Sequence, residues 1–293
     1  MPKETDIPRL DALLEVRDVS KSFNIGPLRQ LVLDQCSFSI ETGRLTVLIG
    51  PSGCGKSTLV NILAGYEAVD AGEVSFLGTP VRGPASDRLV VFQESALFPW
   101  MTTYQNVVYG PVVMRNRSMT DIEADAKQLL ERVGLLEFKD KYPNQLSGGM
   151  QRRAELARAM INNPAIMMLD EPFRGLDAMT RDLMQEYFLR LYEDRKQTVL
   201  FVTSEIDEAI LLADRLLIMS NRPGRIKHTM SIDLQRPRTP DILTSVQYLK
   251  YKQEALEVLH SEAVKAFARG SKAAADFLEA YASQNEETVQ PGK

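Results

Sequence analysis

The spacing of hydrophobic and polar residues changes several times along this chain, and each change predicts a different element. Apolar and polar side chains alternate over Leu14–Val19 and Val32–Ile40, as in half-buried strands, and a polar turn separates the two runs. Leu45–Ile49 reads as an apolar strand without alternation, in which Thr46 is the one polar residue, and this is typical of a strand buried on both faces. Apolar residues then recur at helical spacing over Ser57–Ala64. This first part predicts two alternating strands followed by a strand, a loop and a helix.

The pattern becomes helical between about Glu94 and Met160. Apolar residues there recur every three or four positions, at Ile122, Ala126, Leu129, Leu130 and Val133. Ala165–Leu169 then predicts a second buried strand. The intervening stretch therefore predicts a helical insertion between two halves of an α/β core.

Strands and helices alternate in the next part of the chain. One predicted helix has apolar residues on one face, at Met179, Leu183, Met184, Tyr187, Phe188 and Leu191. It is followed by a strand at Thr198–Thr203, a helix at Ile206–Ala213, a strand at Leu216–Met219 and a turn at Asn221–Gly224. Because these strands are apolar without alternation, we expect a largely parallel sheet covered by helices.

The last sixty or so residues have a pattern of their own. After Arg236–Pro240, apolar residues repeat at helical intervals, at Leu249, Leu256, Leu259, Ala263 and Phe267. Gly270-Ser271 is a candidate break between two helices, and a polar, frayed end is expected from Ser283. We interpret this region as helix packed on the core in preference to a docking or regulatory tail, because amphipathic helices usually pack.

Composition and charge narrow the class of protein. With 44% hydrophobic and 25% charged residues, the 293-residue chain is typical of a soluble globular protein. A net charge of −4 argues against non-specific nucleic-acid binding. A modest basic cluster is interpreted as a solvated face in preference to a nucleic-acid patch; its members are Arg222, Arg225, Lys227, Arg236 and Arg238.

Features of the N-terminus and the cysteines predict a cytosolic location. Met1–Asp6 lacks the apolar core of a signal peptide, and the longest apolar runs are too short to cross a bilayer. The two cysteines, Cys36 and Cys54, fit a reduced protein better than a disulfide framework. Cys54 lies beside a lysine at a helix start, where a thiol pKa can fall, but we prefer the interpretation of a small residue lending its backbone N–H.

A glycine-rich loop between the strand Leu45–Ile49 and the following helix predicts phosphate binding. It consists of Gly50, Pro51, Ser52, Gly53, Cys54, Gly55, Lys56 and Ser57. The glycines let the backbone N–H groups point at a β-phosphate. Lys56 then bridges β- and γ-phosphates, and the Ser57 hydroxyl is a ligand for Mg²⁺. The position between strand and helix is the context that this motif requires.

A carboxylate pair, Asp170 and Glu171, directly follows the apolar strand Ile166–Leu169. Asp170 at the strand end can hold Mg²⁺ through water beside the phosphate loop, and Glu171 can polarise an attacking water. An isolated Asp-Glu pair commonly caps a turn. In a chain that also has a phosphate loop, we favour the catalytic interpretation.

Leu146–Met150 contains a serine and two glycines that open a helix. A helix start of this kind is a second phosphate-binding device, and one nucleotide rarely needs two devices from one chain. Ser147, Gly148 and Gly149 therefore predict that each copy completes the nucleotide site of a partner.

Taken in order, these motifs resemble those of an ATP-binding-cassette ATPase, the nucleotide-binding subunit of an ABC transporter. The resemblance covers about residues 14 to 230. It implies an α/β fold with a P-loop NTPase (RecA-like) core, an N-terminal antiparallel β subdomain, an inserted helical subdomain and a C-terminal helical extension. We therefore expect an ATP-binding domain over residues 1–230, with the helical subdomain at about 94–160, and an extension over 231–293.

The resemblance also implies further site residues. Phe23 matches the aromatic that stacks on adenine, and Thr58 joins the phosphate-loop residues that contact the nucleotide. Gln93 matches the residue that senses the γ-phosphate, contributes to the Mg²⁺ site and couples the helical subdomain to the membrane partner.

The usual histidine after the last core strand is replaced by Ser204, and Arg174 with Gly175 replaces residues that are usually small. These departures predict reduced but real ATPase activity.

A narrower likeness points to importers of the nitrate, sulfonate and taurine group. It is carried by Phe92–Thr102 with Asn106-Val107, and by Ser220–Ile226. Trp100, the single tryptophan, is either an anchor between subdomains or a permease contact.

The expected function is an ATP-hydrolysing subunit that powers an importer for a small anion, at the cytoplasmic face of the plasma (inner) membrane. The implied cofactors are ATP and Mg²⁺. The implied partners are a second ATP-binding subunit, a permease pair and an extracytoplasmic binding protein, with no nucleic acid.

One alternative is a weakly active or regulatory half of a heterodimer. A soluble ABC ATPase of DNA repair or translation is disfavoured, because the chain has neither a long coiled coil nor a second cassette. The transported compound and the choice between homodimer and heterodimer are not readable from the sequence.

Overall fold

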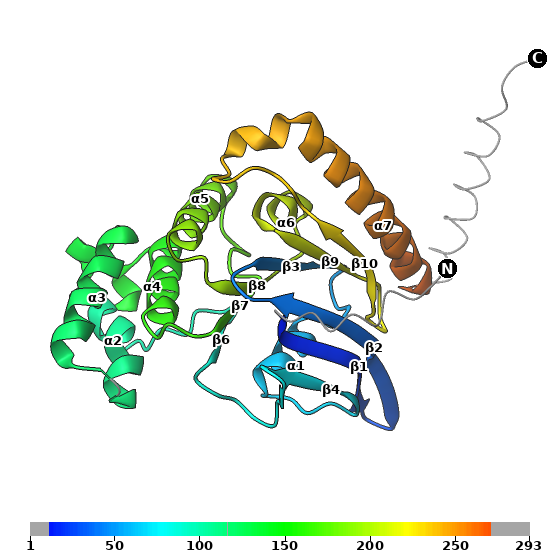
Figure 1. Cartoon of the computed structure of the whole chain (residues 1–293), viewed down its shortest axis with the longest axis horizontal. Coiled ribbons are helices and arrows are strands. Elements are labelled where there is room, and N and C mark those ends of the chain that lie inside the picture. Colours follow the sequence, from blue (N-terminus) through cyan, green and yellow to red (C-terminus); the bar gives the residue numbers. More distant parts are fainter. Residues whose placement is uncertain (1–11, 116, 271–293) are drawn as a thin grey trace, which may run out of the picture.

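The computed structural model describes residues 12–115 and 117–270, which form two sheets with helices around them (Figure 1). The expectations for Met1–Asp6 and for the tail from Ser283 lie outside the described residues, as does any break beyond Gly270. Up to that residue the last helix is continuous.

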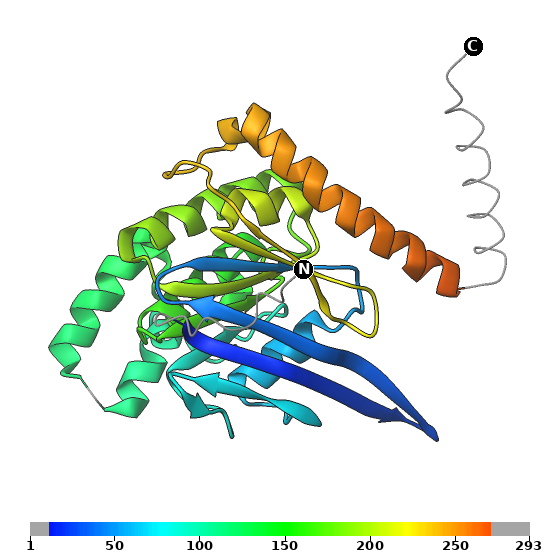
Figure 2. The same cartoon turned by 45° about the vertical axis from the view of Figure 1, so that its right-hand side comes forward.

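The N-terminal part of the chain forms a four-stranded antiparallel sheet of order β2-β1-β4-β5. Its strands are β1 (Ala12–Ile25), β2 (Leu28–Glu41), β4 (Ala71–Phe76) and β5 (Thr79–Pro80). The long β1–β2 hairpin reaches beyond the rest of the sheet (Figure 2). The predicted antiparallel subdomain is confirmed, although β4 and β5 give too short an apolar signal to be predicted.

A six-stranded sheet of order β10-β9-β3-β8-β7-β6 forms the core. Its strands are β3 (Leu45–Ile49), β6 (Arg88–Val91), β7 (Ile166–Asp170), β8 (Thr198–Thr203), β9 (Arg215–Met219) and β10 (Ile226–Ser231). All neighbours are parallel except the edge strand β10, which is antiparallel to β9. The predicted parallel, helix-covered sheet is confirmed.

Two hydrophobic clusters explain why β3 is apolar at every position except the buried Thr46. Val47 and Ile49 pack with residues of α5 (Ala178–Arg195) and α6 (Ile206–Leu212) on one face of the sheet. Leu48 packs with α1 (Lys56–Ala64) and the antiparallel sheet on the other face. Successive side chains of a strand point to opposite faces, so a strand between two layers needs apolar side chains on both.

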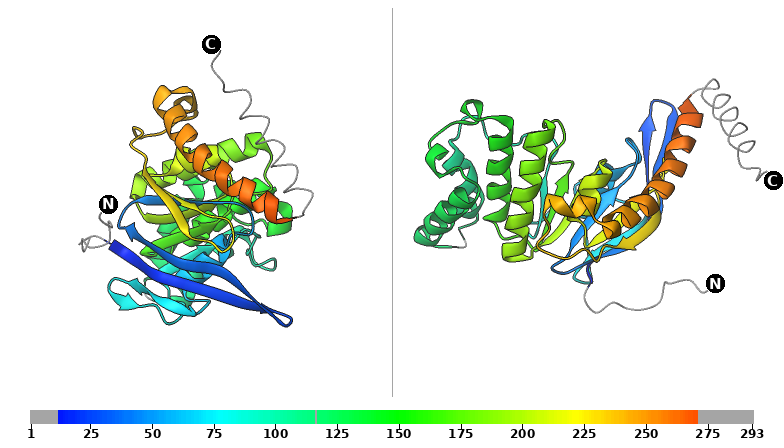
Figure 3. Two further views of the ribbon diagram at one scale, coloured as in Figure 1. Left: turned by 90° about the vertical axis from the view of Figure 1, so that its right-hand side faces the viewer. Right: turned by 90° about the horizontal axis from the view of Figure 1, so that it is seen from above.

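Helices occupy the chain between β6 and β7. These are α2 (Thr103–Met114), α3 (Met119–Arg132) and α4 (Gly148–Met160), with short 3₁₀ turns at Leu136–Phe138 and Pro143–Gln145. Figures 1 and 3 show the three helices together at one end of the molecule. Near the C-terminal end of the described chain, a further 3₁₀ turn at Pro240–Thr244 precedes α7 (Val246–Gly270).

The structure corrects the predicted inward faces of two helices. In α5, Met179 and Leu183 are 78% and 56% exposed, and the buried face is formed by Met184, Gln185, Phe188, Leu189, Leu191 and Tyr192. In α7, Leu249 is 53% exposed, whereas Tyr248, Ala255 and Glu262 are buried at intervals of seven residues. These three are the most buried described side chains of the face that α7 packs against α6 and β9, and the predicted Leu259 packs on the core as a partly buried residue. A hydrophobicity pattern detects the leucine but not the tyrosine, the alanine and the glutamate.

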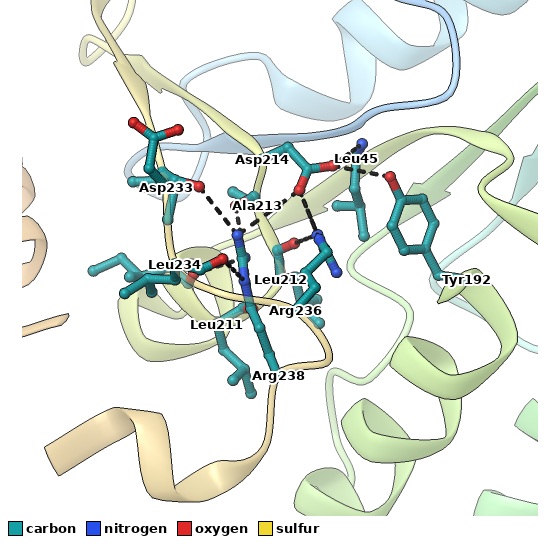
Figure 4. A network of polar contacts seen from close by, with 12 residues as sticks. Leu45, Tyr192, Leu211, Leu212, Ala213, Asp214, Asp233, Leu234, Arg236 and Arg238 are labelled. Carbon is teal, nitrogen blue, oxygen red and sulfur yellow. Dashed lines mark hydrogen bonds and ion pairs between the residues drawn. The ribbon is translucent and has the colours of Figure 1, made fainter. Parts of the chain in front are cut away.

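The predicted solvated basic face is wrong for two of its arginines, because Arg238 is buried and Arg236 is half-buried in a polar network (Figure 4). Arg238 donates to the carbonyl oxygens of Leu211 (2.9 Å) and Ala213 (2.7 Å), at the C-terminal end of α6. Arg236 donates to Asp214 (2.8 Å). Burial, followed by the neighbouring charge of Arg236, lowers the pKa of Arg238 to about 10. The arginines satisfy carbonyls that a helix end leaves without partners.

Asp214 joins this network to the core. Its carboxylate accepts hydrogen bonds from the backbone N–H of Leu45 (2.8 Å) and from the hydroxyl of Tyr192 (2.9 Å). It thereby connects the start of β3 and the end of α5 to the segment that leads into α7.

Candidate nucleotide-binding site

The phosphate loop connects the end of β3 to the start of α1, and close packing requires two of its glycines, Gly50 and Gly55. Gly55 has φ +109°, and a Cβ atom there would lie 2.8 Å from Cδ2 of Leu33. A Cβ atom on Gly50 would lie 2.9 Å from Cβ of Met219. The loop is thus pressed between β2 and β9, which leaves room for backbone alone.

Lys56 extends into the middle of this loop. Its Nζ donates to the carbonyl oxygens of Gly50 (2.9 Å) and Pro51 (3.3 Å), and it lies 3.4 Å from Oε1 of Glu171. The side chain is buried, so its charge acts with little screening by water. The structure therefore brings Lys56 and Glu171 together, as their separate motifs predict.

Asp170 ends β7 beside the phosphate loop. Burial raises the pKa of its carboxyl group, and a hydrogen bond with the Ser57 side chain opposes that rise. Among the described residues, its buried Oδ1 has no hydrogen-bond partner. An unpartnered carboxylate oxygen next to a hydroxyl is a donor set that suits Mg²⁺, which prefers oxygen ligands and retains several waters. The residues present fit the ion.

Glu171 has an unusual backbone. Its φ of +45° lies in the left-handed region, which costs free energy for a residue other than glycine. Its backbone N–H donates to the carbonyl of Val202 (2.9 Å), and Arg174 donates to its Oε2 (2.7 Å). One carboxylate oxygen therefore faces Lys56 and the other faces Arg174.

Ser204 follows β8 and lies near Glu171, as its place in the sequence predicts. Both residues line a small cavity of about 40 Å³ together with Arg174 and Glu208. Ser204 is exposed, whereas Glu208 is buried and accepts a hydrogen bond from Gln185 (2.9 Å). The two departures from the family pattern, Ser204 and Arg174, thus share one cavity.

Gln93 lies in the exposed loop after β6, and α4 holds that loop in place. Arg152 donates to the carbonyl oxygens of Phe92 (2.9 Å) and Gln93 (2.5 Å). Glu155 accepts from the backbone N–H of Ala96 (2.6 Å) and pairs with Arg152 at 2.6 Å. Neither residue is predicted as a site residue from the sequence, because the only signal is an Arg-Glu pair three residues apart on a helix, and the burial of that pair depends on distant segments.

Ser147 is the N-cap of α4, and its Oγ accepts from the backbone N–H of Met150 (3.3 Å). The space beside Gly148 is open, with Cδ2 of Leu176 at 3.9 Å from an added Cβ. Within the described residues, no hydrogen bond or ion pair that we observe joins Ser147, Gly148 or Gly149 to the phosphate loop. Phe23 is half-buried on β1, with its ring centre 5.2 Å from Nζ of Lys21.

Both cysteines are buried. Burial raises the pKa of Cys36 to about 11, and burial also raises the pKa of Cys54 against the opposing charge of Lys56. The idea that the setting of Cys54 lowers its thiol pKa is therefore wrong. The interpretation of Cys54 as a small loop residue agrees with the structure.

Comparison with known proteins identifies the family. The sequence profile described as ABC transporter matches residues 33–174. An uncharacterized ABC transporter ATP-binding protein of Methanocaldococcus jannaschii is 40% identical over 268 residues, which cover 90% of this chain and 99% of the relative. The chain belongs to the ABC transporter family. It is an ATP-binding subunit of that family, and the resemblance drawn from its motifs is confirmed.

Two relatives of this ABC ATP-binding subunit have names that include a cargo. The bicarbonate transport ATP-binding protein CmpD of Synechocystis sp. is 39% identical over 253 residues, covering 85% of this chain and 90% of the relative. The taurine import ATP-binding protein TauB of Jannaschia sp. is 42% identical over 216 residues, covering 73% of this chain and 80% of the relative.

Solved structures agree on the fold of the ABC ATP-binding subunit. A dimeric ATP-binding cassette in a post-hydrolysis state, bound to ADP and Pi, aligns with a TM-score of 0.65 at 27% identity, covering 76% of this chain and all of that one. The protein cbiO1 from Clostridium perfringens aligns with a TM-score of 0.69 at 24% identity, covering 85% of this chain and 98% of that one. At this level of identity the likeness bears on the fold alone. In the described part of the subunit, no helix is long and apolar enough to cross a membrane.

Proposed function

We propose that the chain is the energy-coupling ATPase of an importer, with residues 1–230 as its ATP-binding domain and about 94–160 as an inserted helical subdomain. The observation that carries this proposal is the meeting of Lys56, Asp170 and Glu171 beside one phosphate loop. ATP would lie along Gly50–Thr58 with its adenine on Phe23. Ser57, Asp170 and Gln93 would hold Mg²⁺, which supplies charge neutralisation at the phosphates.

Glu171 is assigned the role of proton acceptor. Attack of a water oxygen on the γ-phosphorus breaks its bond to the β–γ bridging oxygen, and ADP with inorganic phosphate results. The water proton passes to the Glu171 carboxylate, which is positioned by its backbone bond to Val202. Lys56 balances the negative charge of the transferred group. Ser204 can hold the phosphate through a hydroxyl, but it cannot carry the positive charge of a histidine.

A second ATP-binding subunit is proposed to complete each site. Ser147, Gly148 and Gly149 begin α4, and a helix N-terminus attracts phosphate. In a closed pair, these residues would face the γ-phosphate on the partner's loop. Because Arg152 and Glu155 fix α4 to the Gln93 loop, closure would move that loop as well.

The permease is proposed to dock at a hollow of about 340 Å³ next to the Gln93 loop. The hollow lies between β6, α2 and α4, and three of its aromatic side chains, Tyr66, Phe92 and Tyr109, are exposed. Trp100 is 69% exposed and stacks on Phe98, with ring centres 5.5 Å apart. Exposed aromatic side chains around a hollow are typical of protein interfaces.

Replacing Trp100 by alanine is expected to weaken association with the permease by about tenfold or more, because buried tryptophans contribute strongly at interfaces. The measurement is the amount of this chain retained when the detergent-solubilised complex is purified through the permease. Phe138→Ala, an exposed aromatic of the same helical region, is the matched control. Equal retention of the Trp100→Ala and wild-type chains would remove Trp100 from the interface.

The proposed cargo is a small anion of the nitrate, sulfonate and taurine type, delivered by an extracytoplasmic binding protein. The names of the bicarbonate and taurine relatives support this class. The proposed location is the cytoplasmic face of the plasma (inner) membrane. Purification of the intact complex, with its subunits identified and its ATPase activity measured against added anions, tests the proposal. Recovery of the chain without any permease would contradict it.

A second candidate is a weakly active or regulatory half of a heterodimer. Ser204 and the Arg174–Glu171 ion pair favour it, because together they leave Glu171 bound by two cations and without the usual histidine. Identification of a second, different ATP-binding chain in the purified complex would support this candidate over a homodimer.

A further inference from the structure

The turn between β9 and β10 contacts the phosphate loop on one side and helix α7 on the other. Nε of Arg222 donates to the carbonyl oxygen of Gly53 (3.0 Å). The backbone N–H of Asn221 donates to Oε2 of Glu262 on α7 (3.0 Å). Two adjacent residues of one turn therefore connect the C-terminal helix to the loop assigned to nucleotide phosphates.

On the side of the phosphate loop, Arg222 restrains a backbone segment that contains glycine. Gly53 has φ +76°, a conformation that glycine adopts without strain but that other residues avoid. The peptide group is planar, so a bond to the Gly53 carbonyl also orients the N–H of Cys54, which donates to Pro51 (3.3 Å). A methyl group on Gly224 would overlap the Cys54 carbonyl oxygen, so the turn and the loop are in direct backbone contact.

On the side of α7, the contact is made by a buried charge. Glu262 is 3% exposed, and Nζ of Lys227 lies 4.0 Å from its carboxylate. A buried carboxylate is costly unless it is hydrogen-bonded, so the bond to Asn221 holds α7 and the turn together. Oδ1 of Asn221 in turn accepts from the backbone N–H of Arg222 (2.8 Å). The contacts thus continue from Glu262 to Gly53 without a gap.

The base of the turn, at Gly224, is held by hydrogen bonds to β2 and not by contacts with α7. The backbone N–H of Gly224 donates to Val32 (2.7 Å), and its carbonyl accepts from Asp34 (3.0 Å). These bonds to β2 do not involve α7. Release of α7 would therefore free Asn221 and Arg222 while the base of the turn stays in place.

We propose that α7 controls nucleotide affinity through this turn, with Glu262 and Arg222 as positioning residues of the phosphate loop. The inference rests on the proposed function, because it assumes that the loop binds ATP. With α7 docked, Arg222 holds the Gly53–Cys54 peptide and the loop is ordered for phosphate. With α7 displaced, the loop loses this support and binds nucleotide more weakly.

The test uses the full chain and a fluorescent ATP analogue. Glu262→Ala and Arg222→Ala are each expected to weaken binding by about fivefold to tenfold, because each removes a hydrogen bond to a charged group. The affinity of the double variant for the analogue should equal that of the single variant that binds it less tightly. This is expected because both substitutions interrupt the same series of contacts from Glu262 to Gly53. Glu262→Gln should lose less, because its amide oxygen still accepts from Asn221. Glu257→Ala, exposed on α7, and Arg225→Ala, in the same turn, are controls expected to bind as wild type.

Hydrogen exchange of the backbone N–H groups in residues 50–57 gives a readout that does not depend on ATP. Glu262→Ala, or Glu262→Gln if the alanine variant does not fold, should accelerate exchange there, whereas Glu257→Ala should not. Unchanged exchange and unchanged affinity in the Glu262 and Arg222 variants would overturn the linkage. Failure of the proposed function has a different signature: wild type and Lys56→Ala would then bind the analogue equally poorly, while the exchange data would still decide the linkage.

Discussion

Replacing Glu171 by glutamine is expected to lower ATP turnover of the assembled transporter by at least about hundredfold, with ATP binding retained. General-base catalysis contributes about 10²- to 10⁴-fold, and glutamine has a similar shape but cannot accept the water proton. Lys56 and the phosphate loop are unchanged in this variant, so nucleotide binding should persist. The measurement is phosphate release by the purified complex, alongside binding of an ATP analogue.

Glu205→Gln is the matched control for this experiment. Glu205 lines the same small cavity as Glu171 but is exposed and makes no contact with Lys56 that we observe in the described residues. Its turnover should remain near that of wild type. If Glu171→Gln leaves turnover unchanged, this chain does not hydrolyse ATP in its own site, and the regulatory half of a heterodimer becomes the better interpretation.

Replacing Asp214 by alanine is expected to destabilise the chain by about 3 kcal/mol or more. Loss of one partner from a buried ion pair leaves an uncompensated charge, which costs about 3–5 kcal/mol. Here the buried Arg238 would lose its carboxylate neighbour at 3.8 Å, and Arg236 would lose one carboxylate at 2.6 Å while keeping Glu193 at 2.7 Å. The backbone N–H of Leu45 and the hydroxyl of Tyr192 would lose an acceptor as well.

Chemical denaturation of the nucleotide-free chain measures this loss. Asp233→Ala is the control, because Asp233 is exposed and lies close to the same arginines in sequence and in space (Figure 4). Its free energy of unfolding should change by less than about 0.5 kcal/mol. A similar loss in both variants would show that the network of Asp214 is not what stabilises this region.

The hydrophobicity pattern predicted the layers of the fold because the central strands are buried on both faces. Four of the five residues of Leu45–Ile49 are apolar and they lie on both faces of the strand, which leaves a clear signal. The pattern failed where packing depends on other residue types. The most buried described side chains of α7 are Tyr248, Ala255 and Glu262, and Arg238 is a buried cation whose sequence neighbours suggest a surface.

The candidate site was predicted from its motifs to the extent that each motif has its own local signal. The phosphate loop, Asp170 and Glu171 are recognisable from residue types beside strands, and the structure brings them together. Arg152, Glu155, Arg222 and Glu262 were not predicted as site residues. Their roles depend on contacts between segments that are distant in the sequence, and no local pattern encodes such contacts.

The burial of Cys36 and Cys54 has a practical consequence for labelling. These are the only cysteines of the chain, and both have raised thiol pKa values, so at neutral pH they are protonated and shielded from thiol-reactive reagents. A single cysteine introduced at an exposed position such as Met179 would then be the one reactive thiol. The natural sequence is therefore already a suitable background for spin labels, and the distance between two labelled subunits could be followed as nucleotide is added.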